Sequence, residues 1–364
     1  NEQSMSLQFC NLTKGDAKGV FQTFGNRDLR QFRKLSMYIH AEQAEKPANT
    51  IADKQLTAVI RLGTDFVNNY YEVRIPLTLT GLGAGTSPDT DAYNDTLWNP
   101  HNSLELDLSV LTKIKEARNA SSAAMGQIYR QLQANGQVYS VMGNPNLGEV
   151  RGILLGVENS EAAAACGEIW VNELRLSSLD ETGGYAALGR VDVNLADLGT
   201  ISVSANTHTK GFGTLEQRVN ERYRDNFYQF DVAANLEMGK LLPKKWGMSI
   251  PVYAAYTQSV STPEYDPYDQ DIKLKDKINS AGTKDKRDSI RRAAVDYTST
   301  KTLNFTNVKK NKTNGSKSRI YDISNVDISY SYIQTLSHNP LIEHNEVTRH
   351  RAALGYNYAP QPKY

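Results

Sequence analysis

The side chains that could bind a metal or act as nucleophiles are few and widely spaced in this sequence. The histidines show neither the HExxH spacing nor the paired Cys/His spacing that binds zinc. They are His40, His101, His208, His338, His344 and His350. The sequence has no GxSxG nucleophile motif and no P-loop, and Gly211, Phe212 and Gly213 are too short a run for a dinucleotide fingerprint. We therefore expect no catalytic, metal or cofactor site and no enzyme.

Glu168 and Glu173, on either side of Trp170, come closest to a glycosidase carboxylate pair. Such enzymes need two carboxyl groups that face each other across the scissile bond. Side chains alternate along a strand, so this odd spacing places the two glutamates on opposite faces. A hydrolase site is therefore not expected here.

Cys10 and Cys166 are the only cysteines. A disulfide between them is one interpretation. However, two cysteines so far apart do not form a disulfide framework, and two buried thiols are the favoured interpretation.

The charge balance of the chain points to no strongly charged partner. The 41 basic and 40 acidic side chains cancel, which gives no reason to expect nucleic acid or an anionic membrane surface as a partner. Lys273 to Arg292 is dense in charge, but acids interrupt its bases, so it indicates one or two solvated surface helices.

Composition favours an all-β protein. Twenty tyrosines, with frequent Asn, Thr and Ser, are typical of strands and polar surfaces. No apolar run is long enough for a membrane-spanning helix, and the mean hydropathy is −0.53, but a membrane β-barrel has only a weak signal in each strand. The sequence lacks an initiator Met and a signal peptide, so we interpret it as a portion of a longer chain.

Residues 1–178 are predicted to form a β-sandwich of jelly-roll type. Seven or eight short strands alternate with turn signals. They include an alternating run from Ser103 to Leu111 and a last strand from Gly167 to Leu176, and a short helix is expected from Lys113 to Asn119.

Residues 179–364 contain about seven longer strands of cleaner alternation. The clearest is the hairpin from Asn226 to Val260, where one face carries Tyr228, Phe230 and Leu236. A long charged loop is expected at 261–300, followed by strands at 302–310, 324–334 and 349–358.

The apolar face of these strands has two interpretations. It packs on a protein core, as in a soluble sheet, or it faces lipid. The expected strands are long enough to cross a hydrocarbon layer when tilted. Tyrosines and Trp246 near strand ends are typical of membrane interfaces. Seven strands would form only an arc of a large transmembrane β-barrel, because an open edge cannot face lipid.

Short blocks along nearly the whole chain resemble the SprA/Sov family, the giant outer-membrane translocon of the Bacteroidota type IX secretion system. The blocks include Gly167 to Leu176, Gly183 to Ala187, Gly239 to Pro243, Tyr265 to Leu274 and Gly355 to Tyr358. This resemblance implies a protein of the bacterial outer membrane, associated with gliding motility and secretion, of which this chain is an internal or C-terminal portion.

The resemblance also implies partners. These are the remaining segments of the same barrel, a PorV-type outer-membrane barrel protein, a plug protein, the lipid bilayer, and secreted cargo with a C-terminal signal domain. The sandwich would be exposed to the periplasm, the lumen or the cell surface.

Because side chains alternate between the two faces of a strand, every second residue can be assigned to the same face. The residues expected to face the lumen are Asp192, Asn194, Asn206, Asp231, Asn235, Glu237 and Asp327. The residues expected to face lipid are Val193, Val203, Phe230, Leu236, Ile250, Val252, Ile328 and Tyr330.

An alternative hypothesis is a soluble or surface-attached protein whose sandwich binds carbohydrate or mediates adhesion. Exposed aromatic rings such as Trp98 or Trp170 would stack on sugars in that case. Buried tryptophans would argue against it.

Overall fold

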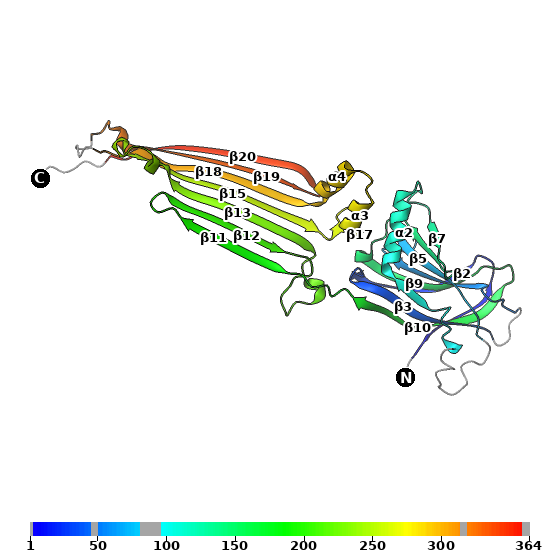
Figure 1. Ribbon diagram of the computed structural model, residues 1–364. Helices are drawn as coiled ribbons and strands as arrows, with labels where there is room; N and C mark the ends of the chain where they lie inside the picture. The colour runs from blue at the N-terminus through cyan, green and yellow to red at the C-terminus, as the bar shows by residue number, and fades with distance from the viewer. Residues whose placement is uncertain (1–2, 45–49, 81–95, 314–318, 359–364) are drawn as a thin grey trace. The chain divides into compact units, whose positions relative to one another are not determined.

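The computed structural model describes residues 3–44, 50–80, 96–313 and 319–358, and they are mostly β-strand (Figure 1). The chain divides into two compact units. The first contains Asn1–Asp180 together with Asp269–Ile272, and the second contains Glu181–Tyr268 and Lys273–Tyr364. Each unit contains its own antiparallel β-sheets.

Two antiparallel sheets form the first unit. The four-stranded sheet has the order β1 (Met5–Leu12), β10 (Ala165–Leu179), β3 (Phe32–Gln43) and β6 (Leu104–Asp107). The six-stranded sheet has the order β2 (Ala17–Arg27), β9 (Val150–Asn159), β4 (Leu56–Gly63), β5 (Tyr70–Pro76), β8 (Val138–Met142) and β7 (Tyr129–Leu132).

The core of the first unit follows from alternation on these strands. Leu35, Met37 and Ile39 of β3 are buried, while Tyr38 between them is exposed. Val73 and Ile75 of β5, in the other sheet, belong to the same buried cluster. The apolar sides of the two sheets therefore pack on each other, and burial of apolar area stabilises the sandwich.

The expected strand from Ser103 to Leu111 is wrong in its second half. Strand β6 ends at Asp107, and helix α2 follows from Leu108 to Ala120. The Asp107 side chain accepts a hydrogen bond from the Ser109 backbone N–H at 2.8 Å and so caps the helix. Leu108, Leu111 and Ile114 then lie on one helical face, which is buried.

The second unit is built on one long sheet (Figure 1). Its strand order is β11 (Ala186–Asn194), β12 (Gly199–His208), β13 (Asp225–Glu237), β15 (Pro251–Pro263), β18 (Asp296–Lys310), β19 (Val326–Asn339) and β20 (Ile342–Tyr356). The short β14 (Met248–Ser249) also pairs with β18. The seven long strands follow one another across the sheet in chain order, so the sheet is an antiparallel meander in which the β15–β18 connection is long.

Two of these strands begin earlier than the sequence pattern predicted. Strand β18 begins at Asp296 rather than Thr302, and β20 begins at Ile342 rather than Arg349. One face of these strands is mostly apolar, but in these stretches it carries Ser299, Lys301 and Glu346. The sequence therefore shows no clear alternation of apolar and polar residues there.

The expected loop at 261–300 is shorter than predicted, and the helices expected within Lys273 to Arg292 are confirmed. It contains β16 (Tyr265–Asp266), β17 (Asp269–Lys273), α3 (Leu274–Ser280) and α4 (Lys284–Ala294). Short 3-10 turns lie at Leu147–Glu149, Val219–Glu221, Met238–Leu241, Lys244–Trp246 and Ile323–Asn325. None of the helices in the described part of the chain combines the length and apolarity needed to cross a bilayer.

Candidate functional site

The long sheet of the second unit has one predominantly apolar face. Directly paired residues of antiparallel strands lie on the same face. One such row runs from Leu236 through Val252 and Phe305 to Tyr330. The next row towards the middle of β13 includes Ile201, Ala234, Ala254 and Leu303. Apolar positions on separate strands therefore form one continuous surface, here called the apolar face.

The opposite face, here called the polar face, carries mainly hydroxyl, amide and charged groups. One row joins Asp231, Thr257, Thr300 and Thr335. Gln229 donates a hydrogen bond to the Asp231 carboxylate at 2.9 Å, and Ser331 donates one to Asn304 at 2.6 Å. Such a surface is well suited to contact water.

The cross-strand register groups the sequence-predicted residues by face. The polar face carries all residues expected to face a lumen: Asp192, Asn194, Asn206, Asp231, Asn235, Glu237 and Asp327. The apolar face carries Val193, Val203, Phe230, Leu236, Val252, Ile328 and Tyr330.

Ile250 is the exception, because it lies between β14 and β15 and outside any strand. Its backbone N–H donates to the Glu237 carboxylate at 2.6 Å, and its carbonyl accepts from the Met238 N–H at 2.9 Å. The expected strand position of Ile250 was therefore wrong. The β13–β15 connection makes its turns before Ile250, at Met238–Leu241 and Lys244–Trp246.

The apolar face has no protein cover among the described residues. Val193 is 45% exposed, Ile328 is 53% exposed and Leu354 is 75% exposed. In the first unit, by contrast, residues of the same types such as Ile39 and Leu106 are fully buried. Exposed apolar surface shared by several strands is typical of a protein–protein or membrane interaction site.

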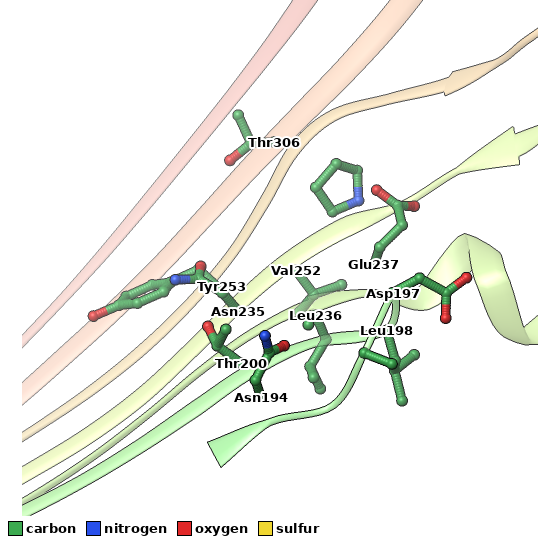
Figure 2. A pocket seen from close by; sticks show the side chains of 13 residues that line it. Asn194, Asp197, Leu198, Thr200, Asn235, Leu236, Glu237, Val252, Tyr253 and Thr306 are labelled. Carbon is green, nitrogen blue, oxygen red and sulfur yellow. The ribbon is translucent and has the colours of Figure 1, made fainter. Parts of the chain in front are cut away.

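A pocket of about 400 Å³ lies at the end of the sheet where β11 turns into β12 (Figure 2). Asn194, Thr200, Asn235 and Tyr253 form one cross-strand row along it. Amide and hydroxyl groups with one aromatic ring can hydrogen-bond a polar chain segment. They do not form a catalytic constellation.

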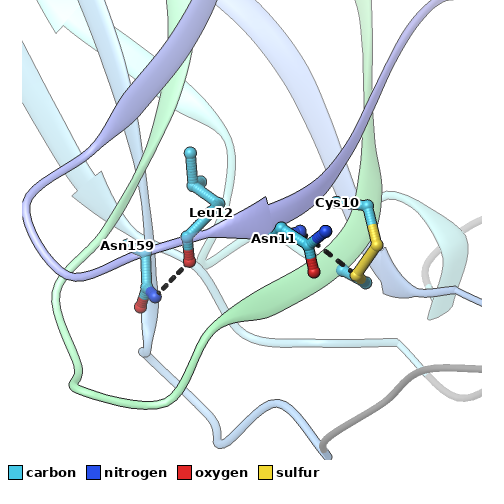
Figure 3. The surroundings of a disulfide bond; sticks show 5 residues. Cys10, Asn11, Leu12 and Asn159 are labelled. Atoms are coloured by element: carbon cyan, nitrogen blue, oxygen red, sulfur yellow. Dashed lines mark hydrogen bonds between the residues drawn. A yellow bond between two sulfur atoms is a disulfide. The ribbon is translucent and has the colours of Figure 1, made fainter.

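Cys10 and Cys166 form a disulfide, which corrects the favoured interpretation of two buried thiols (Figure 3). The residues are 156 positions apart in sequence, but they lie on the neighbouring strands β1 and β10. The Asn11 N–H donates to the Cys166 sulfur at 3.3 Å, and Asn159 donates to the Leu12 carbonyl at 2.8 Å. Strand pairing, which sequence spacing does not reveal, brings the two thiols together.

An aromatic cluster lies on the outer face of the four-stranded sheet. The ring centroid of the buried His40 is 4.5 Å from that of Trp170 and 6.4 Å from that of Trp98. Both tryptophans are half-buried, and the Trp170 N–H donates to Glu168 at 2.8 Å. This packing reduces the free ring surface that the carbohydrate-binding hypothesis requires.

Beside this cluster, Glu168 is paired with Glu42 across the β3–β10 register, and not with Glu173. Burial and the neighbouring Glu168 raise the pKa of Glu42 above its ordinary value. Burial also acts to raise the pKa of Glu168, but hydrogen bonds from Glu42, Gln8 and Trp170 outweigh it and lower that pKa. The alternation of Tyr38, His40 and Glu42 on one strand was the sequence signal for this pair, although it did not identify the partner strand.

A buried ionic network in the first unit was not predicted from the sequence. Lys115 of α2 is 1% exposed and lies 2.6 Å from the Asp269 carboxylate and 3.2 Å from that of Asp271. Tyr71 donates to Asp271 at 2.7 Å, and the Leu147 N–H also donates to Asp271. Burial and the Asp271 charge raise the pKa of Tyr71 well above its ordinary value.

This network holds Asp269–Ile272, a segment that comes between strands of the second unit in sequence, within the first unit. The Lys115 ammonium also donates to the Pro145 carbonyl at 2.7 Å, so its charge is well satisfied. In the described ranges, no group of three or more His, Cys, Asp or Glu residues is arranged to hold a metal ion.

Comparison with known families identifies a family whose model covers most of the chain. The SprA_N family model, described as a motility related/secretion protein, matches residues 1–278. A search of curated proteins finds no match for the chain.

Proposed function

The chain belongs to the SprA/Sov family of motility and secretion proteins, and we propose that it is part of an outer-membrane channel that exports folded cargo proteins. The observation that carries the proposal is the uncovered apolar face of the long sheet. Its central strands β13 and β15 each have 13 residues. About 9–11 residues suffice for a tilted strand to cross a hydrocarbon layer.

The polar face would line the path of the cargo. A wide hydrated lumen lets a folded protein cross the membrane without exchanging its water shell for hydrocarbon, which would be costly for its charged and polar groups. Asp231, Asn235 and Glu237 on β13 would contribute to this lining. Transport of this kind makes and breaks no bond.

The strands would be an arc of a larger barrel. Strand β11 pairs only with β12 and β20 only with β19 among the described residues, so both edges need further strands in a membrane. Remaining segments of the same barrel would supply them.

The first unit would be a jelly-roll sandwich, exposed to the periplasm, the lumen or the cell surface. Two features support this. The chain passes from β1 to β2 and from β9 to β10 between the two sheets, and its last strand, β10, lies between β1 and β3. A double-sheet jelly roll has this kind of alternating order.

The family also supplies the proposed partners. These are a PorV-type outer-membrane barrel protein, a plug protein, and secreted cargo with a C-terminal signal domain. The pocket at the β11–β12 turn, where amide and hydroxyl groups lie beside apolar side chains such as Leu198 and Val252, is a suitable contact for an extended segment of one of them.

Cell fractionation tests the proposal. The parent protein should sediment with outer membranes, resist extraction by carbonate or high salt, and enter solution only with detergent. Extraction into buffer without detergent would contradict a lipid-facing sheet. It would favour the alternative of a soluble or surface-attached adhesive protein.

A further inference from the structure

The centre of the polar face is almost free of charged side chains. Three adjacent cross-strand rows of β12, β13, β15, β18 and β19 form this region, which we call the neutral panel. All of its residues are partly exposed. Its three rows are Ser202, Ala233, Ala255, Thr302 and Ile333; Ser204, Asp231, Thr257, Thr300 and Thr335; and Asn206, Gln229, Ser259, Thr298 and Ser337.

One carboxylate is the only charge in the neutral panel. Charged residues make up 22% of the chain, and such residues ordinarily gather at exposed positions. A polar surface of this size would therefore be expected to carry several of them. The panel carries Asp231 alone, and Gln229 donates a hydrogen bond to its carboxylate at 2.9 Å.

Charged side chains return on the strands at both sides of the panel. On β11, Arg190 and Asp192 lie in two of the same rows and form an ion pair at 2.9 Å. On β20, Arg349 lies in the row of Thr302. The lack of charge is therefore a property of the panel and not of every strand on this face.

The apolar side chains of the panel are few. They are Ala233, Ala255 and Ile333, and two of them end at Cβ. Because apolar attraction grows with the area removed from water, small side chains hold a passing surface weakly. The panel therefore lacks an apolar patch as well as a charged one.

The remaining groups are hydroxyls and amides. The Thr300 and Thr335 hydroxyl oxygens lie 3.4 Å apart across β18 and β19. Groups of this kind exchange a hydrogen bond to water for one to a protein with little net gain. A fixed charge instead attracts groups of opposite sign and repels those of like sign. The panel therefore offers a passing protein surface little that would hold it.

We infer that the neutral panel is a non-adhesive wall of the conduit, along which folded cargo of either net charge, acidic or basic, passes at similar rates. This inference rests on the proposed function and adds the class of cargo to it. A wall with unbalanced charge would retain cargo of opposite sign and exclude cargo of like sign. Groups outside the panel must then select the cargo.

Two reporter cargos test the inference in cells that carry the full-length parent protein. Both reporters have the same folded domain and the same C-terminal signal domain, but surface substitutions give one a strongly negative and the other a strongly positive net charge. The measured quantity is the ratio of their secretion rates into the medium. Both reporters use the same assembled channels, so this ratio does not depend on how much of a variant assembles.

Triple substitutions at Ser259, Thr302 and Ser337 place charge in the panel. These three residues are not directly paired with one another, so like charges do not stand opposite each other across neighbouring strands. One variant carries Lys at all three positions and a second carries Glu. A third carries Gln, which is a matched control of similar length without charge.

The original chain and the Gln variant should secrete the two reporters at rates within about threefold of each other, because neutral hydroxyls and amides favour neither sign. The Lys variant should slow the acidic reporter by more than about threefold relative to the basic one, since exposed ion pairs prolong each contact. The Glu variant should have the opposite effect.

A larger inequality in the original chain would overturn the inference, because the unsubstituted wall would then discriminate by charge. Lys and Glu variants that both keep the ratio of the Gln variant would overturn it too, because the panel would then not touch the cargo. Both results leave the channel itself in place. Secretion of both reporters in cells that lack the parent protein would instead overturn the proposed function.

Discussion

In the first unit two sheets bury their apolar sides against each other, whereas in the second unit a single sheet leaves its apolar side without protein cover among the described residues. The strands of both units alternate with the same period. The difference lies in what covers each apolar side, so alternation alone does not distinguish a strand of a protein core from one whose apolar side is exposed. Substitutions can measure that difference.

The largest expected effect concerns the buried ion network of the first unit. Lys115→Met would leave the Asp271 carboxylate buried without its cation, and removing one partner of such a pair costs about 3–5 kcal/mol of unfolding free energy. Urea unfolding of the chain in detergent, followed by Trp98 and Trp170 fluorescence in a Trp246→Phe background, would measure this. Lys113→Met, at an exposed position of the same helix, is the matched control and should cost little.

A pair of leucines compares the two apolar environments directly. Leu106→Ala should destabilise the sandwich by about 2–5 kcal/mol, because it leaves a cavity in a fully buried site. Leu354→Ala, at a site that is 75% exposed, should change unfolding of the first unit by no more than about 0.5 kcal/mol. Similar losses in that unit's urea transition for both variants would show that the two units unfold together.

A charged substitution probes the lipid contact of the second unit. Leu236→Arg should cost about 2–4 kcal/mol of assembly free energy if this site lies near the bilayer midplane, while Asn235→Arg on the polar face should be mild. Heat-modifiable migration of the parent protein after assembly into vesicles would measure both. Equal tolerance of the two substitutions would break the assignment of faces.

The disulfide should matter to only one unit. Replacing both Cys10 and Cys166 by Ser should lower the stability of the first unit by about 2–4 kcal/mol, since the bridge closes a long loop in the unfolded chain. The hydrogen exchange of β12, β13 and β15 should stay unchanged. A parallel loss of protection in those strands would show that the units unfold together.

The smallest expected effect is a pH dependence at the β4–β5 turn. Burial acts to raise the pKa of Asp65, but hydrogen bonds from Asn68, Asn69 and Val67 outweigh it and lower the pKa to about 2. Because this pKa is lower in the folded state, the Asp65 carboxylate stabilises the fold above the ordinary pKa of about 3.8, and this contribution is lost as pH falls towards 2.

Asp65→Asn should therefore lower stability by only about 1 kcal/mol at neutral pH, since solvent screens this exposed turn. Near pH 2 the stabilities of the variant and the original chain should converge. Urea midpoints measured from about pH 6 down to pH 2 would show this, and a constant difference across the range would contradict it.

The residues that share a face of the long sheet follow from the sequence alone. The period of a strand is fixed by its backbone geometry, so Leu236 and Val252 had to lie opposite Asn235 and Glu237 wherever the strands were placed. The sequence also carried the family resemblance, which the match over residues 1–278 confirms. Alternation failed where polar groups such as Lys301 interrupt the apolar face, and there the strand starts were missed.

Contacts between groups that are distant in sequence depend on the three-dimensional fold. Glu42 pairs with Glu168, Lys115 with Asp271, and Cys10 with Cys166, because strands and segments far apart in sequence lie side by side in the first unit. Side-chain alternation is a local property of the backbone. The register between remote strands depends on packing of the whole unit, and therefore the ion network, the carboxylate pair and the disulfide could not be predicted from spacing.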